Sequence, residues 1–225
     1  MIGIIPAAGK AERMGGIPKF LLPVPGGTLI NVLANRMIDA DLGVELFALT
    51  RRESFEAVLD NTPRLRRLGS LSTQTMSQTV LCGLELAKLE EVDKENVLFG
   101  MPDTYWEAPN VYEQLSAALS DSIVAAALFR ARPGQRLGMC ATWRDRITGV
   151  IDKPEQTSLK WAWGALAWRP EFWQYIKPDD PHVGFALARA PEPRAVCFEG
   201  NYWDCGTPNE YFHMIRHLTK EAVIE

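Results

Sequence analysis

The sequence contains few of the residues on which metal clusters, disulfide frameworks and membrane anchors depend. It has 4 cysteines and 3 histidines in 225 residues, and none of the cysteines form a C-x-x-C pair. Because Cys82, Cys140, Cys197 and Cys205 are scattered, a zinc site and a disulfide framework are both disfavoured. No apolar run approaches the roughly 18 residues of a membrane-spanning helix, and the chain starts in an apolar strand rather than a charged leader. We therefore expect a soluble, cytoplasmic protein with no membrane partner.

An excess of positive charge is also absent. The 24 lysines and arginines are outnumbered by 28 aspartates and glutamates, which gives a formal net charge of −4. Proteins that hold nucleic acid without sequence preference need a broad basic surface. We therefore expect no nucleic-acid partner. The hydrophobic content of 47% over this length is enough for the core of one large α/β domain.

Two common phosphate-binding loops are missing. The dinucleotide fingerprint requires G-x-G-x-x-G, whereas Gly9 is followed by Lys10 and Ala11. The Walker A loop requires Gly-Lys-Ser/Thr after its second glycine, and residues 15–17 read Gly-Gly-Ile. The sequence therefore excludes the usual NAD-binding and P-loop ATPase patterns.

The histidines offer one candidate metal pair. His213 and His217 stand at positions i and i+4 of an expected C-terminal helix, so both can face the same ligand. The acidic partner of the H-E-x-x-H pattern is lacking, which argues against a metal site of that kind.

The first 24 residues carry the strongest local signal. An apolar run, Ile2–Pro6, predicts a buried strand and is followed by the small residues Ala7-Ala8-Gly9. Small residues leave backbone N–H groups accessible, and a concave set of such groups binds anions. Arg13 and Lys19 add two cations nearby, as a polyphosphate requires. An ordinary strand-to-helix loop with solvated charges explains the same residues, so this stretch alone leaves both interpretations open.

Apolar strands and amphipathic helices alternate through the first half. We expect strands at 2–6, 44–50, 96–101 and 123–129, and helices at 28–38, 52–59, 75–89 and 109–119. This alternation predicts a mostly parallel sheet with helices on both faces. Ligands of such sheets bind beyond the carboxyl ends of the strands. Gly9, Arg13 and Asp103 all fall at that edge.

The second half has a different pattern, with a hairpin at 140–143 and 147–151 and further strands at 163–168 and 194–199. A turn is expected at 202–208, followed by a closing helix. No Pro/Gly/Ser linker separates the halves. We expect one domain, 1–225, with a nucleotide-binding half at about 1–130 and an acceptor-binding half at about 131–225.

The stretch from Ala7 to Val24 resembles the signature of the nucleotidyltransferases that make activated sugars and activated alcohols, L-A-A-G-x-G-x-R-x…P-K-x-L-L-P-V. The matching residues are Ala7, Ala8, Gly9, Arg13, Met14, Pro18, Lys19, Leu21, Leu22, Pro23 and Val24. Ala11 replaces the second glycine of that signature. The short interval between Arg13 and Lys19 is closer to the cytidylyltransferases of isoprenoid synthesis. The resemblance implies a Rossmann-like mixed, mostly parallel sheet of the nucleotide-diphospho-sugar transferase type.

Two aspartates are candidate Mg²⁺ ligands. Asp103 follows an expected central strand, and Asp204 lies in a turn that can return to the same edge. Carboxylate oxygens suit Mg²⁺, although aspartate is also common in turns for structural reasons. Spacing cannot show that the two meet. The resemblance implies it, because Asp103 matches the acid of the family's G-D motif and Asp204 that of its W-x-D-x-G-T motif.

The resemblance also supplies acceptor residues. Lys153 matches the E-K-P motif, which holds the acceptor's phosphate, with Asp152 in place of glutamate. Gly164 matches the glycine of the N-x-G-x-Y segment that lines the sugar pocket. Six of the seven tryptophans lie between Trp143 and Trp203. They can stack on a sugar or cage a quaternary ammonium, but core packing or a subunit interface is the favoured explanation.

The nucleotide base has a weaker signal. The segment Thr79–Leu84 resembles the S-V-x-x-G-L of the cytidylyltransferases, in which the hydroxyl lies beside the nucleotide. Gln74 is placed to read a pyrimidine edge. The start of an amphipathic helix accounts for the same letters, so both interpretations stay open.

Together these implications predict a nucleotidyltransferase that moves NMP from an NTP, with a pyrimidine favoured, to a sugar 1-phosphate and releases pyrophosphate with Mg²⁺. Arg13 and Lys19 are expected to be catalytic, the first on the triphosphate and the second at the α-phosphorus. Ala7, Ala8 and Gly9 would bind the nucleotide. One alternative is a cytidylyltransferase making a CDP-alcohol from phosphocholine or a polyol phosphate. A second is a non-catalytic nucleotide-binding subunit. A homo-oligomer is compatible with the sequence.

Overall fold

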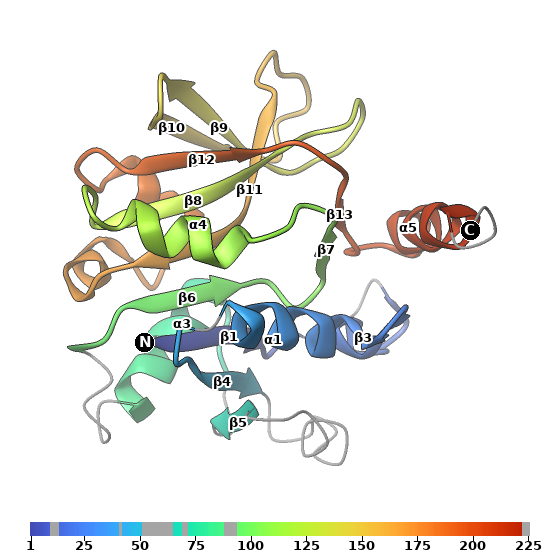
Figure 1. Cartoon of the computed structure of the whole chain (residues 1–225), viewed down its shortest axis with the longest axis horizontal. Helices are drawn as coiled ribbons and strands as arrows, with labels where there is room; N and C mark the ends of the chain where they lie inside the picture. Colours follow the sequence, from blue (N-terminus) through green and yellow to red (C-terminus); the bar gives the residue numbers. More distant parts are fainter. Residues whose placement is uncertain (10–13, 41, 51–64, 69–71, 88–93, 222–225) are drawn as a thin grey trace.

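A nine-stranded sheet runs through both halves of the chain in this computed structural model, which describes all residues except 10–13, 41, 51–64, 69–71, 88–93 and 222–225 (Figure 1). Its strands are β1 (Ile2–Ala7), β4 (Glu45–Thr50), β5 (Leu65–Leu68), β6 (Val97–Gly100), β8 (Val124–Arg130), β9 (Gly138–Trp143), β10 (Arg146–Asp152), β11 (Trp161–Trp168) and β12 (Arg194–Phe198). The strand order is β5-β4-β1-β6-β11-β8-β12-β10-β9. Strands from the two halves alternate at its centre, where β11 lies between β6 and β8.

Parallel and antiparallel pairs occupy different parts of this sheet. Strands β5, β4, β1 and β6 are all parallel, as expected from the βα alternation of the first half. Strand β11 is antiparallel to both β6 and β8, and the β9–β10 hairpin is antiparallel as well. The mixed α/β class predicted from the sequence is confirmed. Parallel pairing dominates only the first half, because antiparallel strands need no helical crossover to return.

Two short ribbons lie outside the large sheet. Strand β7 (Thr104–Trp106) pairs antiparallel with β13 (Tyr202–Asp204), and β2 (Pro23–Val24) pairs with β3 (Gly27–Thr28). The sequence analysis predicted a turn from residue 202 onward, and this was wrong for its first three residues. They form a strand because β7 offers them a free edge, a long-range partner that local sequence does not reveal.

The helices follow the predicted pattern within the described residues. They are α1 (Leu29–Asp39), α3 (Met76–Ala87), α4 (Val111–Ala118) and α5 (Pro208–Glu221), together with the 3-10 helices η2 (Lys19–Leu21), η5 (Pro170–Tyr175) and η6 (Val183–Ala188). Thr28 and Asn31 form a capping box that fixes the start of α1. Asn110 precedes α4 with a left-handed φ of 52°, so this helix begins later than Pro109 suggested. The helix expected at 52–59 lies outside the described residues.

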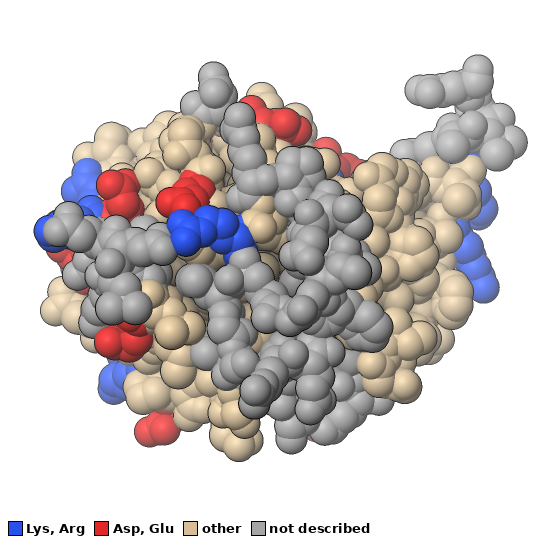
Figure 2. Space-filling model, turned by 90° about the horizontal axis from the view of Figure 1, so that it is seen from below, with Lys and Arg blue, Asp and Glu red and all other residues tan. Residues whose placement is uncertain are grey.

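The surface charge is mixed. On the face seen in Figure 2, the described basic and acidic side chains form small separate groups rather than one basic field. Within the described ranges, no helix combines the length and the apolar character that crossing a membrane demands.

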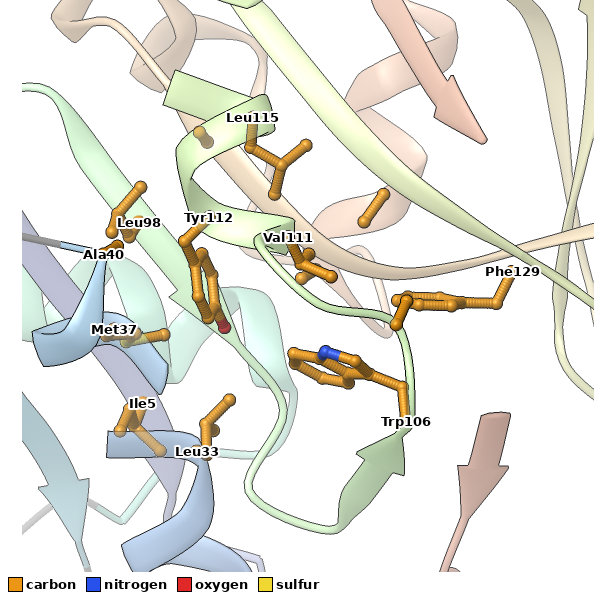
Figure 3. Close-up of a cluster of buried hydrophobic side chains, with 14 of the residues drawn as sticks. Ile5, Leu33, Met37, Ala40, Leu98, Trp106, Val111, Tyr112, Leu115 and Phe129 are labelled. Atoms are coloured by element: carbon orange, nitrogen blue, oxygen red, sulfur yellow. The ribbon is translucent and has the colours of Figure 1, made fainter. Parts of the chain in front are cut away.

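Alternate residues of the central strands build a core on each face of the sheet. On one face, α1 and α4 cover residues such as Ile5, Leu98 and Phe129, and Trp106 packs beside them (Figure 3). On the other face, α3, η5 and η6 cover the neighbours of these residues, for example Ile4. Successive strand residues point to opposite faces, so strands covered on both sides are apolar throughout. These two layers hold the carboxyl ends of β1 and β6 in fixed positions.

Candidate functional site

Asp103 and Asp204 lie side by side because β7 pairs with β13. Asp103 immediately precedes β7, and Asp204 ends β13 opposite Thr104. The backbone N–H of Cys205 donates to the carbonyl oxygen of Asp103 over 2.8 Å, which closes the ribbon at this end. The predicted convergence of the two aspartates is therefore present in the structure.

Local chemistry fixes the end of this ribbon that carries the aspartates. The hydroxyl of Thr104 donates to the carbonyl of Met101 over 2.8 Å and makes the tight turn after β6. In β13, Trp203 is fully buried in an apolar cluster with Cys205. Successive residues of a strand point to opposite faces, so burial of Trp203 turns the carboxylate of Asp204 away from that cluster.

Lys19 reaches the same place from the first loop. Its Nζ lies 3.2 Å from Oδ2 of Asp103, and the two side chains are 16% and 25% exposed. Helix η2, which begins with Lys19, is anchored by the buried side chain of Phe20, and Leu22 is buried just beyond it. The lysine is thus held at the carboxylate pair by apolar packing on either side of it.

Burial and a neighbouring carboxylate both act against ionisation of Asp204. Burial, with a smaller contribution from repulsion by Asp103, raises the pKa of Asp204 to about 6, against the lowering effect of Lys19, Lys153 and the N–H of Gly206. Two neighbouring carboxylates that are incompletely neutralised favour a bound cation. Their oxygens suit Mg²⁺, so these residues fit that ion. The described ranges contain no cluster of three or more His, Cys, Asp or Glu side chains able to hold a metal. Phosphate and water oxygens would have to complete the shell.

Gly206 is a site residue to which the sequence analysis assigned no role. A β-carbon at this position would lie 2.9 Å from Oδ1 of Asp204 and 3.7 Å from Nζ of Lys19. Glycine therefore leaves the space that the carboxylate and the ammonium occupy. The sequence did contain a signal for this role, because Gly206 is the glycine of the motif that resembles W-x-D-x-G-T, two residues after Asp204.

Lys153 joins the site from the second half. It follows β10 directly and has a left-handed φ of 44°. Its N–H donates to the carbonyl of Leu137 over 3.0 Å, and Arg136 donates to its carbonyl over 3.4 Å. The Lys153 ammonium is one of the charges that lower the pKa of Asp204. Lys19, Asp103, Asp204 and Lys153 thus form one electrostatic group.

The residue exposed after β1 is Gly9. Ala7 and Ala8 are buried, whereas Gly9 is exposed and no described atom lies within 4 Å of where its β-carbon would be. A ligand can therefore approach the Gly9 backbone closely. Arg13 lies outside the described residues, as does Ala11.

Gln74 and Thr79 lie at the start of α3. The Thr79 hydroxyl is buried and donates to the carbonyl of Thr75 over 3.1 Å. Gln74 is exposed, and its N–H donates to Oε1 of Gln78 over 2.8 Å. Thr75 in turn donates to the carbonyl of Pro178, which ties this helix start to the segment before η6. Their assignment to the nucleotide base stays a prediction.

Gly164 has a packing role in the structure. It lies at a bulge between β11 and β8, and a β-carbon there would approach the rings of Tyr202 and Phe129 to 2.6 and 2.7 Å. Trp163 and Trp168, its neighbours in β11, are buried too. Core packing therefore accounts for these tryptophans, and a role for Gly164 in acceptor binding stays a prediction.

His213 and His217 attach α5 to β13. The indole N–H of Trp203 donates to Nδ1 of His213 over 3.1 Å. Nε2 of His217 lies 2.7 Å from Oε1 of Glu107 and 3.2 Å from Nδ2 of Asn201. These contacts give both histidines a structural function behind the strand that ends in Asp204.

The comparisons with known proteins agree with this geometry. Residues 3–163 match the sequence profile of the MobA-like NTP transferase domain family. The chain belongs to this family. The enzyme class inferred from the sequence, a nucleotidyltransferase, is thereby confirmed. A comparison with curated proteins finds no match.

Solved structures share the fold of this nucleotidyltransferase over nearly its whole length. A protein described as a glucose-1-phosphate thymidylyltransferase from Bacillus anthracis, in complex with sucrose, is 17% identical with a TM-score of 0.77, covering 95% of this chain and 93% of its own. A UDP-glucose pyrophosphorylase complexed with UDP-glucose is 18% identical with a TM-score of 0.76 and 98% coverage of both chains. The UTP-bound UGPase from Acinetobacter baumannii is 16% identical with a TM-score of 0.77, covering 100% and 98%. At these identities the likeness establishes the fold.

Replacing Asp204 by asparagine should stabilise the metal-free protein at neutral pH. The folded pKa of Asp204 is raised from 3.8 to about 6, so the folded state binds more protons than the unfolded state between these values. Wild-type stability from this group therefore falls as pH rises from about 4 to about 6. Asp204→Asn should be more stable by up to about 3 kcal/mol well above pH 6, with the difference vanishing near pH 4. Urea unfolding in EDTA measures this, and a less stable variant at pH 7.5 contradicts the assignment.

Gly206→Ala should displace the Asp204 carboxylate without unfolding the protein, because the added β-carbon collides with the mobile end of a side chain rather than with backbone. We expect the increase in melting temperature produced by MgCl₂ plus NTP to fall to less than half. Gly149→Ala, whose β-carbon would meet nothing closer than Ala141 at 3.9 Å, is the control for the added methyl group. A full Mg²⁺-NTP shift in Gly206→Ala would show that the carboxylate has no need of this space.

Proposed function

We propose that this protein transfers NMP from an NTP to a sugar 1-phosphate and releases pyrophosphate in a Mg²⁺-dependent reaction. The observation that carries the proposal is the gathering of two carboxylates and two lysines from four separate segments at one end of the sheet. Two solved neighbours, described as a glucose-1-phosphate thymidylyltransferase and a UDP-glucose pyrophosphorylase, favour a sugar phosphate as acceptor.

The reaction is an in-line displacement at phosphorus. An oxygen of the acceptor phosphate forms a bond to the α-phosphorus of the NTP while the bond from this phosphorus to the β-phosphate oxygen breaks, and pyrophosphate leaves. No nucleophilic side chain is required, so positioning and charge neutralisation supply the catalysis. Bound at Asp103 and Asp204, Mg²⁺ would neutralise phosphate charge and orient the phosphate oxygens.

Each element of the site then has a role. Lys19, already held at the carboxylate pair, stabilises the negative charge that develops around the α-phosphorus, and Arg13 binds the triphosphate. The N–H groups around Ala7, Ala8 and Gly9 contact the nucleotide phosphates. These residues belong to a nucleotide-binding half at about 1–130.

The acceptor is held by the half at about 131–225. Lys153 binds its phosphate, and Gly164 lies in the strand beneath the acceptor pocket. Gln74 and Thr79, at the start of α3, contact the base, for which a pyrimidine is favoured.

A phospho-alcohol is the second candidate acceptor. The short interval between Arg13 and Lys19 and the Thr79 segment are similar to cytidylyltransferases, so CTP with phosphocholine or a polyol phosphate is the corresponding pair. A subunit that only binds nucleotide is disfavoured, because a binder without turnover does not need both Asp103 and Asp204 at the cost of their mutual repulsion.

A pyrophosphate-release screen tests the proposal. ATP, CTP, GTP, UTP and dTTP are each combined with glucose 1-phosphate, mannose 1-phosphate, phosphocholine and glycerol 3-phosphate, in MgCl₂ or EDTA. We expect Mg²⁺-dependent turnover with a pyrimidine nucleotide and a sugar phosphate. Turnover only with CTP and phosphocholine or glycerol 3-phosphate would select the alternative, and binding of nucleotide without any turnover would select the non-catalytic subunit.

Asp103→Asn is the inactive reference for this screen. Loss of one carboxylate should lower kcat by about a hundredfold or more, the scale of a lost electrostatic contact in a transition state. Glu199→Gln, at an exposed acid paired with Arg130 at 3.9 Å, is the matched control. Turnover of Asp103→Asn within threefold of wild type would refute the metal role of this residue.

Lys153→Ala should affect the acceptor more than the nucleotide. Removing a cation from a phosphate contact should raise the KM for the acceptor about tenfold, while the KM for the NTP changes less than twofold. Initial rates with each substrate varied in turn measure both values. Lys160→Ala removes an exposed charge of the same kind and serves as the control. Equal increases in both KM values would mean that Lys153 is misassigned.

A further inference from the structure

A buried imidazole lies behind the corner that carries Lys153. His182 immediately precedes η6 and is 9% exposed. Its ring stacks on Phe185 at a centroid distance of 4.7 Å and lies 5.1 Å from the ring of Trp163. Its Nε2 is 3.1 Å from Oδ1 of Asp152, the last residue of β10. Aromatic packing therefore fixes the orientation in which the imidazole meets this carboxylate.

The contact between His182 and Asp152 is the polar centre of an otherwise apolar region. Oδ1 of Asp152, both ring nitrogens of His182 and the indole N–H of Trp163 are buried without a well-aligned hydrogen bond to any described residue. Polar atoms in a protein interior are normally hydrogen-bonded, so such a group calls for an explanation other than stability.

Burial determines the charge on the imidazole. It lowers the pKa of His182 below the ordinary value of 6.5. Asp152 opposes this with a smaller effect, and the charges of Lys153 (lowering) and Asp180 (raising) contribute least. The ring is therefore neutral at pH 7 and can present one N–H to the Asp152 carboxylate. Asp180 itself pairs with Arg189, which leaves Asp152 as the carboxylate at Nε2.

Asp152 adjoins Lys153 in the chain, at the point where the backbone leaves β10. The left-handed φ of 44° at Lys153 is unfavourable for a residue with a side chain, so this corner needs support. The backbone N–H of Lys153 is held by the Leu137 carbonyl. The His182 ring contacts the side chain of Asp152, the residue immediately before the lysine.

We propose that His182 is a positioning residue for the acceptor: it holds the Asp152 carboxylate and thereby aims Lys153 at the acceptor phosphate. The inference rests on the acceptor role proposed for Lys153. If it is correct, the segment at η6, which is remote in sequence from Lys153, influences which phosphorylated acceptor binds and how tightly.

Three variants separate positioning from packing. His182→Phe keeps an aromatic ring against Phe185 and Trp163 but removes the N–H. His182→Gln places an amide donor near the former Nε2. Phe185→Leu alters the packing and keeps the imidazole. Steady-state kinetics use the best nucleotide and acceptor pair of the screen above, and thermal melting checks that each variant folds.

We expect His182→Phe to raise the KM for the acceptor about tenfold, the scale of one lost polar contact to a charged group, with the KM for the NTP unchanged within twofold. His182→Gln should restore most of this loss, and Phe185→Leu should leave the acceptor KM unchanged. In an Asp152→Ala background, His182→Phe should add no further loss, because its effect passes through that carboxylate.

The proposal is overturned if His182→Phe leaves the acceptor KM unchanged, raises both KM values equally, or adds its full effect to Asp152→Ala. If wild-type protein turns over none of the tested pairs, the proposed function is wrong, but the positioning role of His182 is still open to a binding test. Calorimetric titration of glucose 1-phosphate then decides the positioning role: weaker binding to His182→Phe than to wild type supports it, and equal or undetectable binding overturns it.

Discussion

The candidate site depends on one piece of backbone pairing, the ribbon of β7 and β13. The hydrogen bond from the Cys205 N–H to the Asp103 carbonyl brings together two acidic residues from opposite halves of the chain. Two carboxylates would not approach each other without such a constraint, because their repulsion opposes it. The ribbon is held by apolar packing that opposes this repulsion: Trp106 and Trp203 are both completely buried. The apolar cores thus supply the energy that keeps the acidic pair assembled.

The raised pKa of Asp204 shows that its ionised form is destabilised in this assembly. Lys19 and Lys153 offset part of the negative charge, but each is also suited to bind a phosphate. A Mg²⁺-bound nucleotide would bring positive charge to the aspartates and negative charge to the lysines at once. The arrangement is therefore less stable alone than with its substrates, as expected for a preorganised site and unlike an ion-pair network whose purpose is stability.

Much of the first half follows from local sequence. The period of apolar residues and the capping Thr28 specify α1, and the apolar run Ile2–Pro6 specifies β1. Strand β5, by contrast, was not predicted, because its four residues, Leu65–Leu68, place two arginines between leucines and show no strand alternation. Strand β13 was not predicted either, since its partner is distant in the chain. Long-range pairing is invisible to periodicity.

The site shows the same division. Strand ends indicated Asp103, while the meeting of Asp103 with Asp204 came only from the family resemblance. Gly164 was selected by that resemblance for the acceptor, and the structure adds a packing reason that sequence cannot reveal. His182 was missed because a single histidine in a Pro/Asp-rich segment has no motif around it. Its significance depends on Asp152 lying 3.1 Å away, a tertiary contact.

The two sides of the site are built on different supports, and this matters for how specificity can change. Lys19 and the aspartates rest on η2 and the β7–β13 ribbon, which pack with α1 and α5. Lys153 rests on the end of β10, against η6 and the opposite core. If Lys153 has the proposed acceptor role, substitutions around η6 would change the acceptor side while the carboxylate pair keeps its own contacts. The proposed division would let such a protein keep one phosphoryl-transfer chemistry and exchange acceptors, because the contacts that assemble the acidic pair are separate from those that support Lys153.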